Sequence, residues 1–415
     1  MNKQLITKNS EGGGWKIPLT VFTLAHTVGT VHSTAVTVMV PVIKNFYDIP
    51  YTAVAFLITC YSIGQTLSSI PNGGMIDRIG VRSGLLVAHG VLLAAALLLF
   101  CADIIWLAYL ALFLMGWGYS AINPATAKGV YQTFNRTRRA TAMGIKQTGV
   151  PLGGVVAGLL GGIAVSHHDQ AAGWNLQWQT IMLIVSAATV ARAFLCLLLP
   201  KSLSQPTVTS EKRSIWADLS TIAGDWPFNR FVISTMAFNF GQYNFFTFLT
   251  AFLTKVLGVT QEMAGGVYAI VQATSAFFRP FWGFASDFFF RSRKKALCVG
   301  LCFVASICFG ACALISIAGA PIWMGIAISI ILGASIASYA PLVQVMAVEA
   351  VDPKMIGSGL GYAHMGTHLG ASIGPLAMGI LLDLYSYAVG YGLTATLVLI
   401  GVGLLVFGFK ERPAR

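Results

Sequence analysis

Long apolar runs separated by short polar segments fill this chain from one end to the other. A helix that crosses the hydrocarbon core of a bilayer needs about 20 mainly apolar residues. The apolar runs predict twelve transmembrane helices, at residues 17–43, 50–71, 82–102, 104–131, 141–166, 178–200, 228–255, 262–286, 295–318, 321–347, 357–383 and 387–409. The expected fold class is therefore an all-α polytopic membrane protein.

A polar stretch divides the predicted helices into two sets of six. Residues 201–226 are rich in Ser, Thr, Gln, Lys and Arg, unlike the apolar sequence on either side. We expect a cytoplasmic linker there. The boundary predicts an N-terminal six-helix bundle at residues 1–200 and a C-terminal six-helix bundle at residues 227–415.

The two halves repeat each other at fixed spacing. Six positions match at an offset of 217 residues (333 minus 116), and two more match at an offset of 210 (283 minus 73). The first set pairs Gly116 with Gly333, Pro124 with Pro341, Gly144 with Gly361, Gly149 with Gly366, Leu152 with Leu369 and Gly153 with Gly370. The second set pairs Gly73 with Gly283 and Asp77 with Asp287. Two pseudo-symmetric bundles are what a carrier needs when it rocks between two access states.

Composition agrees with a chain that lies in lipid. Of its 415 residues, 56% are hydrophobic and 10% are charged, whereas a soluble protein carries about 25% charged residues. The seven cysteines all lie within apolar runs, which argues against a disulfide scaffold and against a thiolate metal site. We expect neither a cofactor nor a metal.

Membrane orientation explains the net charge of +12. With the N-terminus in the cytoplasm, twenty of the 26 Lys and Arg residues fall in inside segments, and Lys44 and Lys255 fall in outside loops. Because Lys and Arg concentrate in cytoplasmic loops, we expect both termini on the cytoplasmic side. The charge then requires no nucleic-acid partner. We expect a monomeric, multi-pass protein of the bacterial inner membrane.

The predicted loop after helix 50–71 carries a motif. It reads Gly73-Gly74-Met75-Ile76-Asp77-Arg78-Ile79-Gly80-Val81-Arg82. This segment resembles the loop signature of the major facilitator superfamily, Gly-x-Leu-x-Asp-Arg-x-Gly-x-Arg, with Met75 as a conservative departure. Together with the predicted helices, the linker and the termini, the resemblance covers essentially the whole chain and implies a transporter that works by alternating access.

The resemblance implies a conformational latch at this loop. Gly73 would let its helix approach a neighbour closely. Asp77 would face the positive N-terminal end of another helix, which the resemblance places near Ser358. The other members of this segment and of its degraded copy in the second half are Arg78, Gly80, Arg82, Gly283 and Asp287. The alternative is a charge cluster that only sets topology.

Glycine and proline residues in two further predicted helices indicate close packing and gating. Helix 141–166 carries Gly149 and Pro151 in a run that resembles the superfamily's antiporter motif, although the proline lies one place later. Helix 357–383 carries Gly374 and Pro375. Close packing and a bend are sufficient to explain these residues, so we assign them to gating rather than to chemistry.

The predicted membrane core contains cations but no carboxylate. All 14 Asp and Glu residues fall in loops, termini or the last turn of a helix. Four basic residues lie inside predicted helices: Lys128, Lys146, Arg192 and Arg279. Each such charge costs on the order of 2.5 to 3.5 kcal/mol to insert. We therefore expect the counter-charge to come from the substrate, which would be a small organic anion.

These four cations have different expected roles. Arg279 resembles the substrate-clamping arginine of the oxalate/formate and monocarboxylate porters, and its alternative is a structural arginine that hydrogen-bonds helix carbonyls. Lys146, with Gln147 beside it, is a candidate for substrate binding or gating, although it could snorkel to the cytoplasmic interface. Lys128 and Arg192 are expected to snorkel.

Polar residues near helix midpoints complete the candidate site. The resemblance implies that helices 17–43, 104–131, 228–255 and 321–347 line the cavity. The first three carry His26, Thr30, His32, Tyr119, Asn123, Asn239, Gln242, Tyr243 and Asn244. A histidine, with its ordinary pKa of about 6.5, would have to carry any coupled proton, and the candidates are His26, His32, His364 and His368. For each of these residues, helix packing is the alternative.

The predicted function is secondary active transport of a small, monocarboxylate-like organic anion, by proton symport or exchange. An amino-acid or other zwitterion carrier is the alternative, since a buried cation would hold its carboxylate equally well. A drug/proton antiporter fits less well, because such carriers rely on intramembrane acids. A receptor would not need the latch and the gating glycines. No enzyme is expected, because the chain lacks a Ser-His-Asp spacing, a His-Glu-x-x-His helix and a phosphate-binding loop.

Overall fold

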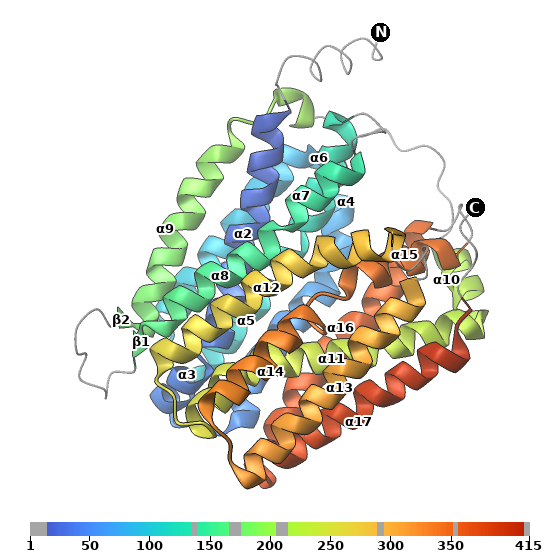
Figure 1. The fold of residues 1–415 in the computed structure, drawn as a ribbon. Helices are drawn as coiled ribbons and strands as arrows, with labels where there is room; N and C mark the ends of the chain where they lie inside the picture. Colours follow the sequence, from blue (N-terminus) through green and yellow to red (C-terminus); the bar gives the residue numbers. More distant parts are fainter. Residues whose placement is uncertain are drawn as a thin grey trace. The chain divides into compact units, whose positions relative to one another are not determined.

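The computed structural model describes residues 15–134, 139–165, 176–204, 215–288, 294–351 and 356–410. These residues are almost entirely helical (Figure 1). Contacts divide the chain into two compact units: Met1–Tyr47 with Cys60–Ser210, and Asp48–Thr59 with Glu211–Arg415. The sequence did not predict that Asp48–Thr59, which precedes the linker by some 150 residues, belongs with the second unit.

Asp383 explains why this early segment joins the second unit. Its carboxylate accepts hydrogen bonds from the backbone N–H groups of Tyr51 (2.8 Å) and Thr52 (2.7 Å) and from the hydroxyl of Thr52 (2.6 Å). The first N–H groups of a helix have no partner within the helix. A carboxylate there also meets the positive end of the helix dipole, so Asp383 caps a helix from a distant part of the chain.

The first unit is built from helices that pack around α2. The helix α2 contacts α8 along most of its length, and it also contacts α5, α6, α7 and α9. The helices are α2 (Lys16–Val38), α3 (Val40–Tyr47), α4 (Tyr51–Phe100, whose residues up to Thr59 belong to the second unit), α5 (Ile105–Ser120), α6 (Ile122–Thr133), α7 (Arg139–Gln147), α8 (Gly149–Gly162) and α9 (Trp178–Cys196). Two short parallel strands, β1 (Ala164–Val165) and β2 (Leu176–Gln177), pair before α9, and a 3-10 helix, η2 (Lys201–Ser204), follows it.

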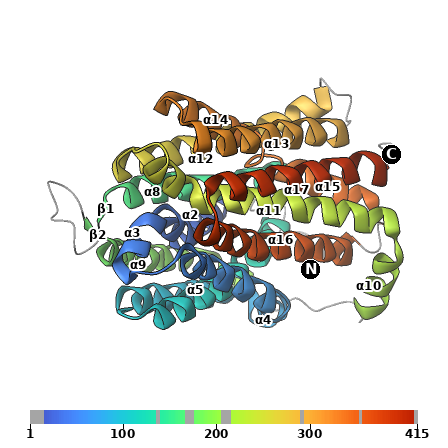
Figure 2. The ribbon, with the colours of Figure 1, turned by 90° about the horizontal axis from the view of Figure 1, so that it is seen from below.

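The second unit has a row of four adjacent helices. Figure 2 shows α11 between α16 and α17, with α13 on the far side of α17, and the same neighbours are in contact. The helices are α10 (Ile215–Gly224), α11 (Trp226–Lys255), α12 (Gln261–Phe288), α13 (Lys294–Ala318), α14 (Ile322–Ala334), α15 (Ala340–Ala350), α16 (Ile356–Leu384) and α17 (Tyr387–Gly408). Both η2 and α10 lie in the predicted linker, where the sequence analysis placed no helix.

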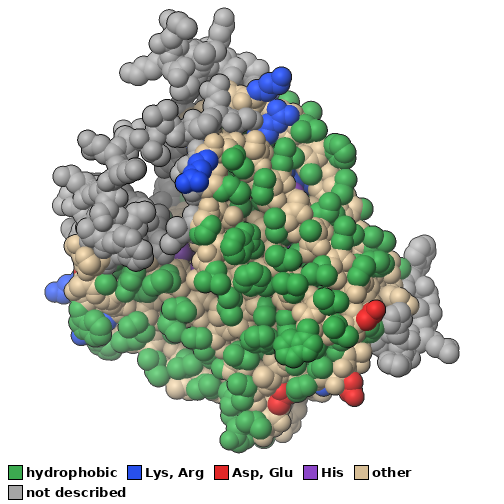
Figure 3. Space-filling view, turned by 180° about the vertical axis from the view of Figure 1, so that it is seen from behind, with side chains coloured by type: hydrophobic (Ala, Val, Ile, Leu, Met, Phe, Trp, Pro, Cys, Tyr) green, Lys and Arg blue, Asp and Glu red, His purple; other side chains and the backbone are tan. Residues whose placement is uncertain are grey.

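Each of the twelve predicted spans lies over one or two of these helices. Among the described residues, six helices are long and apolar enough to cross a membrane, and a seventh if the bent pair Val40–Tyr47 and Tyr51–Ser69 counts as one span. The six are Arg78–Phe100, Ile105–Val130, Trp178–Cys196, Lys294–Ala318, Tyr362–Leu384 and Tyr387–Gly408. The other spans are interrupted or carry more polar residues, so the number twelve stays a prediction. Hydrophobic side chains dominate the face seen in Figure 3, with Lys and Arg toward its margins.

Prolines interrupt three of the predicted spans. A proline has no N–H for the carbonyl four residues earlier, and its ring clashes with that carbonyl. Pro124 frees the carbonyl of Ser120, where α5 ends, and Pro151 frees that of Gln147, where α7 ends. Pro341 lies at the position in the second half that corresponds to Pro124. It frees the carbonyl of Ala337, within the irregular segment that joins α14 to α15.

The predicted loop of the motif is reduced to a break at one residue. The helix α4 continues through it, with non-helical backbone angles at Gly80 (φ 80°, ψ 173°). Positive φ is disfavoured for residues that carry a Cβ, which accounts for a glycine at this position. Arg78 is exposed and Arg82 is half-buried. The side chains of Asp77, Asp287 and Ser358 lie outside the described residues, so the proposed latch contact stays a prediction.

Gly73 of the motif and Gly283 of its copy have open space beside them. A Cβ added at Gly73 or at Gly283 would meet nothing within 4 Å. Gly73 therefore contacts no other helix of its own unit at this point, and its role in close helix approach stays a prediction. The close approaches lie elsewhere: a Cβ at Gly149 would overlap the carbonyl oxygen of Thr23, and one at Gly370 would overlap that of Met236. These contacts join α8 to α2 and α16 to α11, as small residues do between membrane helices.

Candidate functional site

Lys146 lies near the end of α7, and its side chain is completely buried. The ammonium group donates to Asn123 Oδ1 (3.0 Å) and to Thr126 Oγ1 (3.0 Å), and it lies 3.5 Å from the Asn123 carbonyl oxygen. From the sequence, Lys146 could also snorkel toward the membrane surface. The structure instead shows it pointing inward, at the first turn of α6.

Thr126 connects this lysine to a histidine. Its hydroxyl donates to the carbonyl of Ile122 (2.8 Å), and His26 Nε2 lies 3.0 Å from the same oxygen. Because the Thr126 hydroxyl donates its hydrogen to the Ile122 carbonyl, its oxygen accepts hydrogen bonds from the Lys146 ammonium and from the His26 Nε2–H. The other ring nitrogen, Nδ1, is then an acceptor. It is buried and has no hydrogen-bond partner among the described residues.

Two further residues extend the group across α2 and α5. The Thr30 hydroxyl lies 3.2 Å from the hydroxyl of Tyr119. The rings of His26 and Tyr119 meet edge to face at 6.5 Å. We call this set the Lys146 cluster. Its members are His26, Thr30, Tyr119, Asn123, Thr126 and Lys146. Tyr119 and Asn123 flank the break at Ala121, and Lys146 lies two residues before the break at Thr148.

The Lys146 cluster contains a positive charge without a negative one. Among the described residues, no carboxylate lies within ion-pair distance of Lys146. The ion pair found in this part of the chain joins Lys294 to Glu349 at 3.0 Å. Burying an ammonium group costs several kcal/mol unless a charge or good hydrogen bonds compensate it. Two neutral oxygens compensate in part. The arrangement is therefore suited to receive an anion, with hydroxyl, amide and imidazole groups around the cation.

His32 lies away from the cluster. It is fully buried between α2 and α9, where Nδ1 lies 2.8 Å from the Val28 carbonyl oxygen and Nε2 lies 3.1 Å from Thr189 Oγ1. Both ring nitrogens therefore have partners within the helices. The sequence could not separate His26 from His32, because both lie on the same predicted helix. Their different neighbours separate them.

The expectation that Arg192 snorkels is wrong. Its side chain is 2% exposed, and its guanidinium donates to the carbonyl of Val21 (2.8 Å) and to the Cys196 sulfur. It is a tie between α9 and α2. Lys128 is half-buried and donates to the carbonyl of Ile76 in α4 (3.2 Å). Both cations are held by backbone oxygen, so neither shares the environment of Lys146.

Arg279 in α12 holds the irregular segment of the second unit. Its Nε and Nη2 atoms lie 3.3 and 3.2 Å from the Ala337 carbonyl oxygen, which also accepts from the hydroxyl of Ser275 (2.8 Å). This is the carbonyl that Pro341 leaves without a helical partner. An unwound backbone group inside a membrane protein must find such a partner. This geometry corresponds to the structural alternative for Arg279, and its substrate role stays a prediction.

A matching hydrogen bond occurs in each unit. The Asn72 side chain donates to the Trp117 carbonyl (2.8 Å), and the Trp282 indole donates to the Ala334 carbonyl (2.7 Å). The residue numbers of the two donors differ by 210 and those of the two acceptors by 217. These are the two offsets of the sequence repeat. Different side chains thus perform the same task in the two halves, just before the break in the helix.

The predicted residues of α11 lie in several environments. Asn239 donates to the hydroxyl of Tyr339 (2.6 Å), which is in the irregular segment. Asn244 is fully buried and donates to Thr394 in α17 (2.9 Å), so it serves packing between helices. Gln242 is buried, and Tyr243 is half-buried.

The remaining predicted residues lie apart from the Lys146 cluster or at its edge. His364 and His368 stack on one face of α16 with ring centroids 6.3 Å apart, as their i, i+4 spacing predicts. Gln147 ends α7 and is half-buried. Gly374 packs against the backbone of Phe240, and Pro375 lies within α16. Within the described residues, no group of three metal-binding side chains occurs.

Thr126, the residue that joins Lys146 to His26, was not among the predicted site residues. A signal was present, because Thr126 follows Asn123 by three residues and so shares its helix face. Ser275 and Tyr339 were also not among the predicted site residues. These two could not have been found, because their role depends on a carbonyl exposed by a helix break.

Known proteins resemble this chain over nearly its full length. The Major Facilitator Superfamily matches residues 21–319 and again residues 231–415. A hexuronate transporter of Bacillus subtilis (strain 168) is 26% identical over 389 residues, covering 89% of this chain and 88% of that protein. The solved structure of a D-xylose–proton symporter has a TM-score of 0.79 at 13% identity, covering 95% of this chain and 97% of that one. The nucleoside transporter NupG has a TM-score of 0.77 at 13% identity, covering 95% and 100%.

These matches identify the class of protein. The fold is that of multi-pass membrane transporters, and the superfamily matches most of the chain. The chain belongs to the Major Facilitator Superfamily. The resemblance that the motif at Gly73–Arg82 indicated is thereby confirmed.

Proposed function

We propose that this protein is a secondary active transporter of small organic anions that works by alternating access. The observation that carries the proposal is the fully buried Lys146 ammonium, which contacts neutral oxygens and no described carboxylate. A carboxylate bound there would make charge-assisted hydrogen bonds, which are about twice as strong as neutral ones. The bound carboxylate would then compensate the buried positive charge of Lys146.

A sugar acid is the substrate class that this site would suit best. A hexuronate carries one carboxylate and several hydroxyl groups, and a hexuronate transporter is among the relatives of this chain. Lys146 would hold the carboxylate. Asn123 and Tyr119 would exchange hydrogen bonds with the hydroxyl groups. A monocarboxylate without hydroxyls would use Lys146 alone and is expected to bind more weakly.

An amino-acid or zwitterion carrier is the second candidate. It needs a carboxylate to bind an ammonium group on the substrate as well as a cation for its carboxylate. The described residues around Lys146 supply no such acid, which favours the anion. The same lack disfavours a drug/proton antiporter. For the motif segment Gly73–Arg82, together with Asp287, we keep the role of conformational latch, and for Gly149, Pro151, Gly374 and Pro375 that of gating.

The proposal is tested by uptake into proteoliposomes that contain the purified full-length protein. Radiolabelled D-glucuronate is expected to accumulate above protein-free vesicles, and unlabelled glucuronate or galacturonate should compete at least tenfold better than glucose. Lactate should compete weakly, and alanine and tetraphenylphosphonium should not compete. Competition by glucose equal to that by glucuronate would contradict an anion site. Competition by alanine would favour the zwitterion carrier.

His26 is the histidine that we propose for proton coupling. It shares Thr126 with Lys146, and its Nδ1 is a buried acceptor without a described partner. A proton on His26 would add a positive charge close to Lys146 and Arg192, whereas a substrate carboxylate would offset that charge. Binding of the anion and of the proton would therefore favour each other. This is the requirement for symport.

Replacing His26 is expected to uncouple uptake from pH. In wild-type proteoliposomes, an inward proton gradient should raise the initial rate of glucuronate uptake several-fold. His26→Gln should show less than a third of that stimulation, while exchange of internal for external glucuronate continues. His32→Gln is the matched control on the same helix and should keep the stimulation. Loss in His32→Gln with retention in His26→Gln would reverse the assignment.

A further inference from the structure

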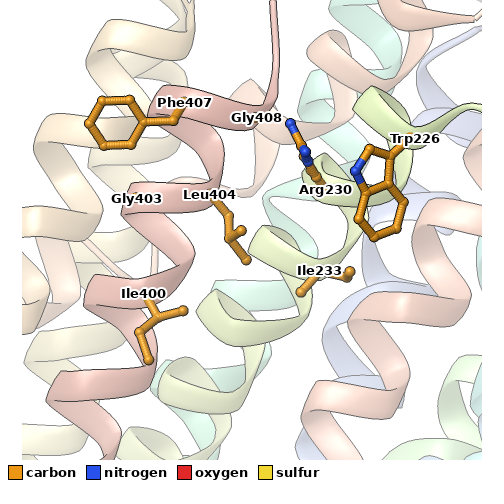
Figure 4. A pocket seen from close by; sticks show the side chains of 8 residues that line it. All are labelled: Trp226, Arg230, Ile233, Ile400, Gly403, Leu404, Phe407 and Gly408. Carbon is orange, nitrogen blue, oxygen red and sulfur yellow. The ribbon is translucent and has the colours of Figure 1, made fainter.

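A groove opens on the outer face of the second unit, between the start of α11 and the end of α17 (Figure 4). Its volume is about 580 Å³. The residues along it face outward: Trp226 is 57% exposed, Ile400 is 52% exposed and Phe407 is 88% exposed. Exposed apolar surface of this kind on membrane helices faces lipid.

Glycine residues form one wall of the groove. A Cβ placed at Gly403 would meet nothing within 4 Å, so the space beside it is open. A Cβ at Gly408 would fall 2.6 Å from Cδ of Arg230, because the stem of this arginine lies over the glycine. The groove therefore exists where α17 has no side chain, and Arg230 marks one of its ends.

The end at Arg230 is polar and positive. The guanidinium carbon lies 5.4 Å from the centre of the Trp226 ring, and Figure 4 shows the arginine between that ring and Gly408. Among the described residues, its side chain has no hydrogen bond or ion pair. The Asp225 carboxylate instead accepts from the Phe228 N–H (3.1 Å).

Two lysines add to the positive charge near this end. Lys410 is exposed and follows α17 by two residues. Lys295 donates to the carbonyls of Val406 and Phe409, at the end of the same helix. The first residue of α11 and the last residue of α17 lie at this end of the groove. Arginine and tryptophan are typical of such a position, where helices leave the membrane.

The other end of the groove is apolar. From Gly408 to Ile400 the groove follows α17 for eight residues, which is about 12 Å at the rise of an α-helix. Ile233 on α11 and Leu404 on α17 lie along this part. A cation at the interface and an apolar track that leads inward match a molecule with an anionic head and a hydrocarbon chain.

We propose that this groove is a binding site for an anionic phospholipid. Its phosphate would pair with Arg230, and one acyl chain would lie along Gly403 and Leu404 toward Ile400. The groove lies at the predicted cytoplasmic end of the helices. There, the anionic headgroups of the membrane attract basic residues. The Lys146 cluster belongs to the other unit, so the lipid site does not depend on the proposed substrate.

Native mass spectrometry of the purified full-length protein tests this site. The probes are palmitoyl-oleoyl phosphatidylglycerol and palmitoyl-oleoyl phosphatidylcholine, added in equal amounts. Gly403→Leu fills the open wall and should lower the phosphatidylglycerol bound by at least fivefold. Gly392→Leu is its control, because Gly392 lies on the same helix, outside the groove, and also has open space at its Cβ. This control should bind lipid as the wild type does.

Arg230→Gln tests the headgroup contact. It should abolish the preference for phosphatidylglycerol over phosphatidylcholine, whereas Lys16→Gln, at an exposed lysine of α2, should keep it. Equal binding by Gly403→Leu and Gly392→Leu would overturn the proposal. So would a retained preference in Arg230→Gln. A shift from dimer to monomer in Gly403→Leu without loss of lipid would assign the groove to a second copy of the chain and would also overturn it.

Discussion

Lys146→Met is expected to reduce glucuronate uptake by at least tenfold without lowering the thermal stability of the protein. A charge-assisted hydrogen bond to substrate is worth about 1.5–3 kcal/mol, which is roughly ten- to a hundredfold in affinity. Stability should behave in the opposite way. Replacing an uncompensated buried charge by an apolar side chain of similar volume is often neutral or stabilising.

Three variants separate the functional role of Lys146 from a structural one. Lys128→Met removes a cation of the neighbouring helix α6, which donates to the Ile76 carbonyl. This variant should leave the affinity for glucuronate unchanged. Lys146→Arg keeps the charge and should retain measurable uptake, at a higher half-saturating concentration. Thermal unfolding of each variant, with and without glucuronate, gives the second readout. An unfolding temperature that rises with glucuronate in Lys146→Met as in the wild type would contradict the proposed site.

Arg279→Lys is expected to lower uptake by about tenfold, with normal expression. The arginine directs two N–H groups at the Ala337 carbonyl oxygen, 3.3 and 3.2 Å away. Lysine has no planar fork, so it cannot reproduce this geometry or a bidentate grip on a carboxylate. Initial rates and half-saturating concentrations of glucuronate measure the effect. Wild-type uptake in Arg279→Lys would show that uptake depends neither on a grip of Arg279 on substrate nor on its contact with the Ala337 carbonyl.

Ser275→Ala distinguishes the two roles of Arg279. Ser275 donates to the same carbonyl at 2.8 Å but carries no charge. If Arg279 acts by gripping substrate, Ser275→Ala should keep the wild-type affinity for glucuronate, and Arg279→Lys should lose it. An equal loss in both variants would assign Arg279 to holding the unwound segment.

Much of the fold follows from local sequence. The apolar runs mark where helices lie, because only segments with internally satisfied backbone can reside in lipid. The breaks at Ser120 and near Ala337 follow from Pro124 and Pro341, since proline removes a donor wherever it stands. The motif at Gly73–Arg82 was sufficient to indicate the superfamily. What the motif glycines contact could not be deduced, because Gly73 faces open space while Gly149 meets Thr23.

The candidate site could be predicted in its residue types but not in its membership. Lys146, His26, Tyr119 and Asn123 all stood out as polar groups in apolar sequence. So did His32 and Arg192, which lie apart from the Lys146 cluster and bond to Val28, Thr189 and Val21. These residues differ in the neighbouring helix toward which each side chain points. A buried polar group bonds to whatever neighbour its helix face presents, and one sequence does not reveal which helices are neighbours.

Sequence alone was enough to predict that the chain lies in a membrane, that its halves repeat and that its predicted membrane core holds cations without carboxylates. These properties depend on composition and spacing, which are local. Which of these cations lacks a strong partner became clear only from the contacts between helices. Arg192 and Arg279 found backbone carbonyls across helix contacts, whereas Lys146 was left with an amide and a hydroxyl. Because Lys146 is buried, its charge is the one that a bound anion would stabilise most.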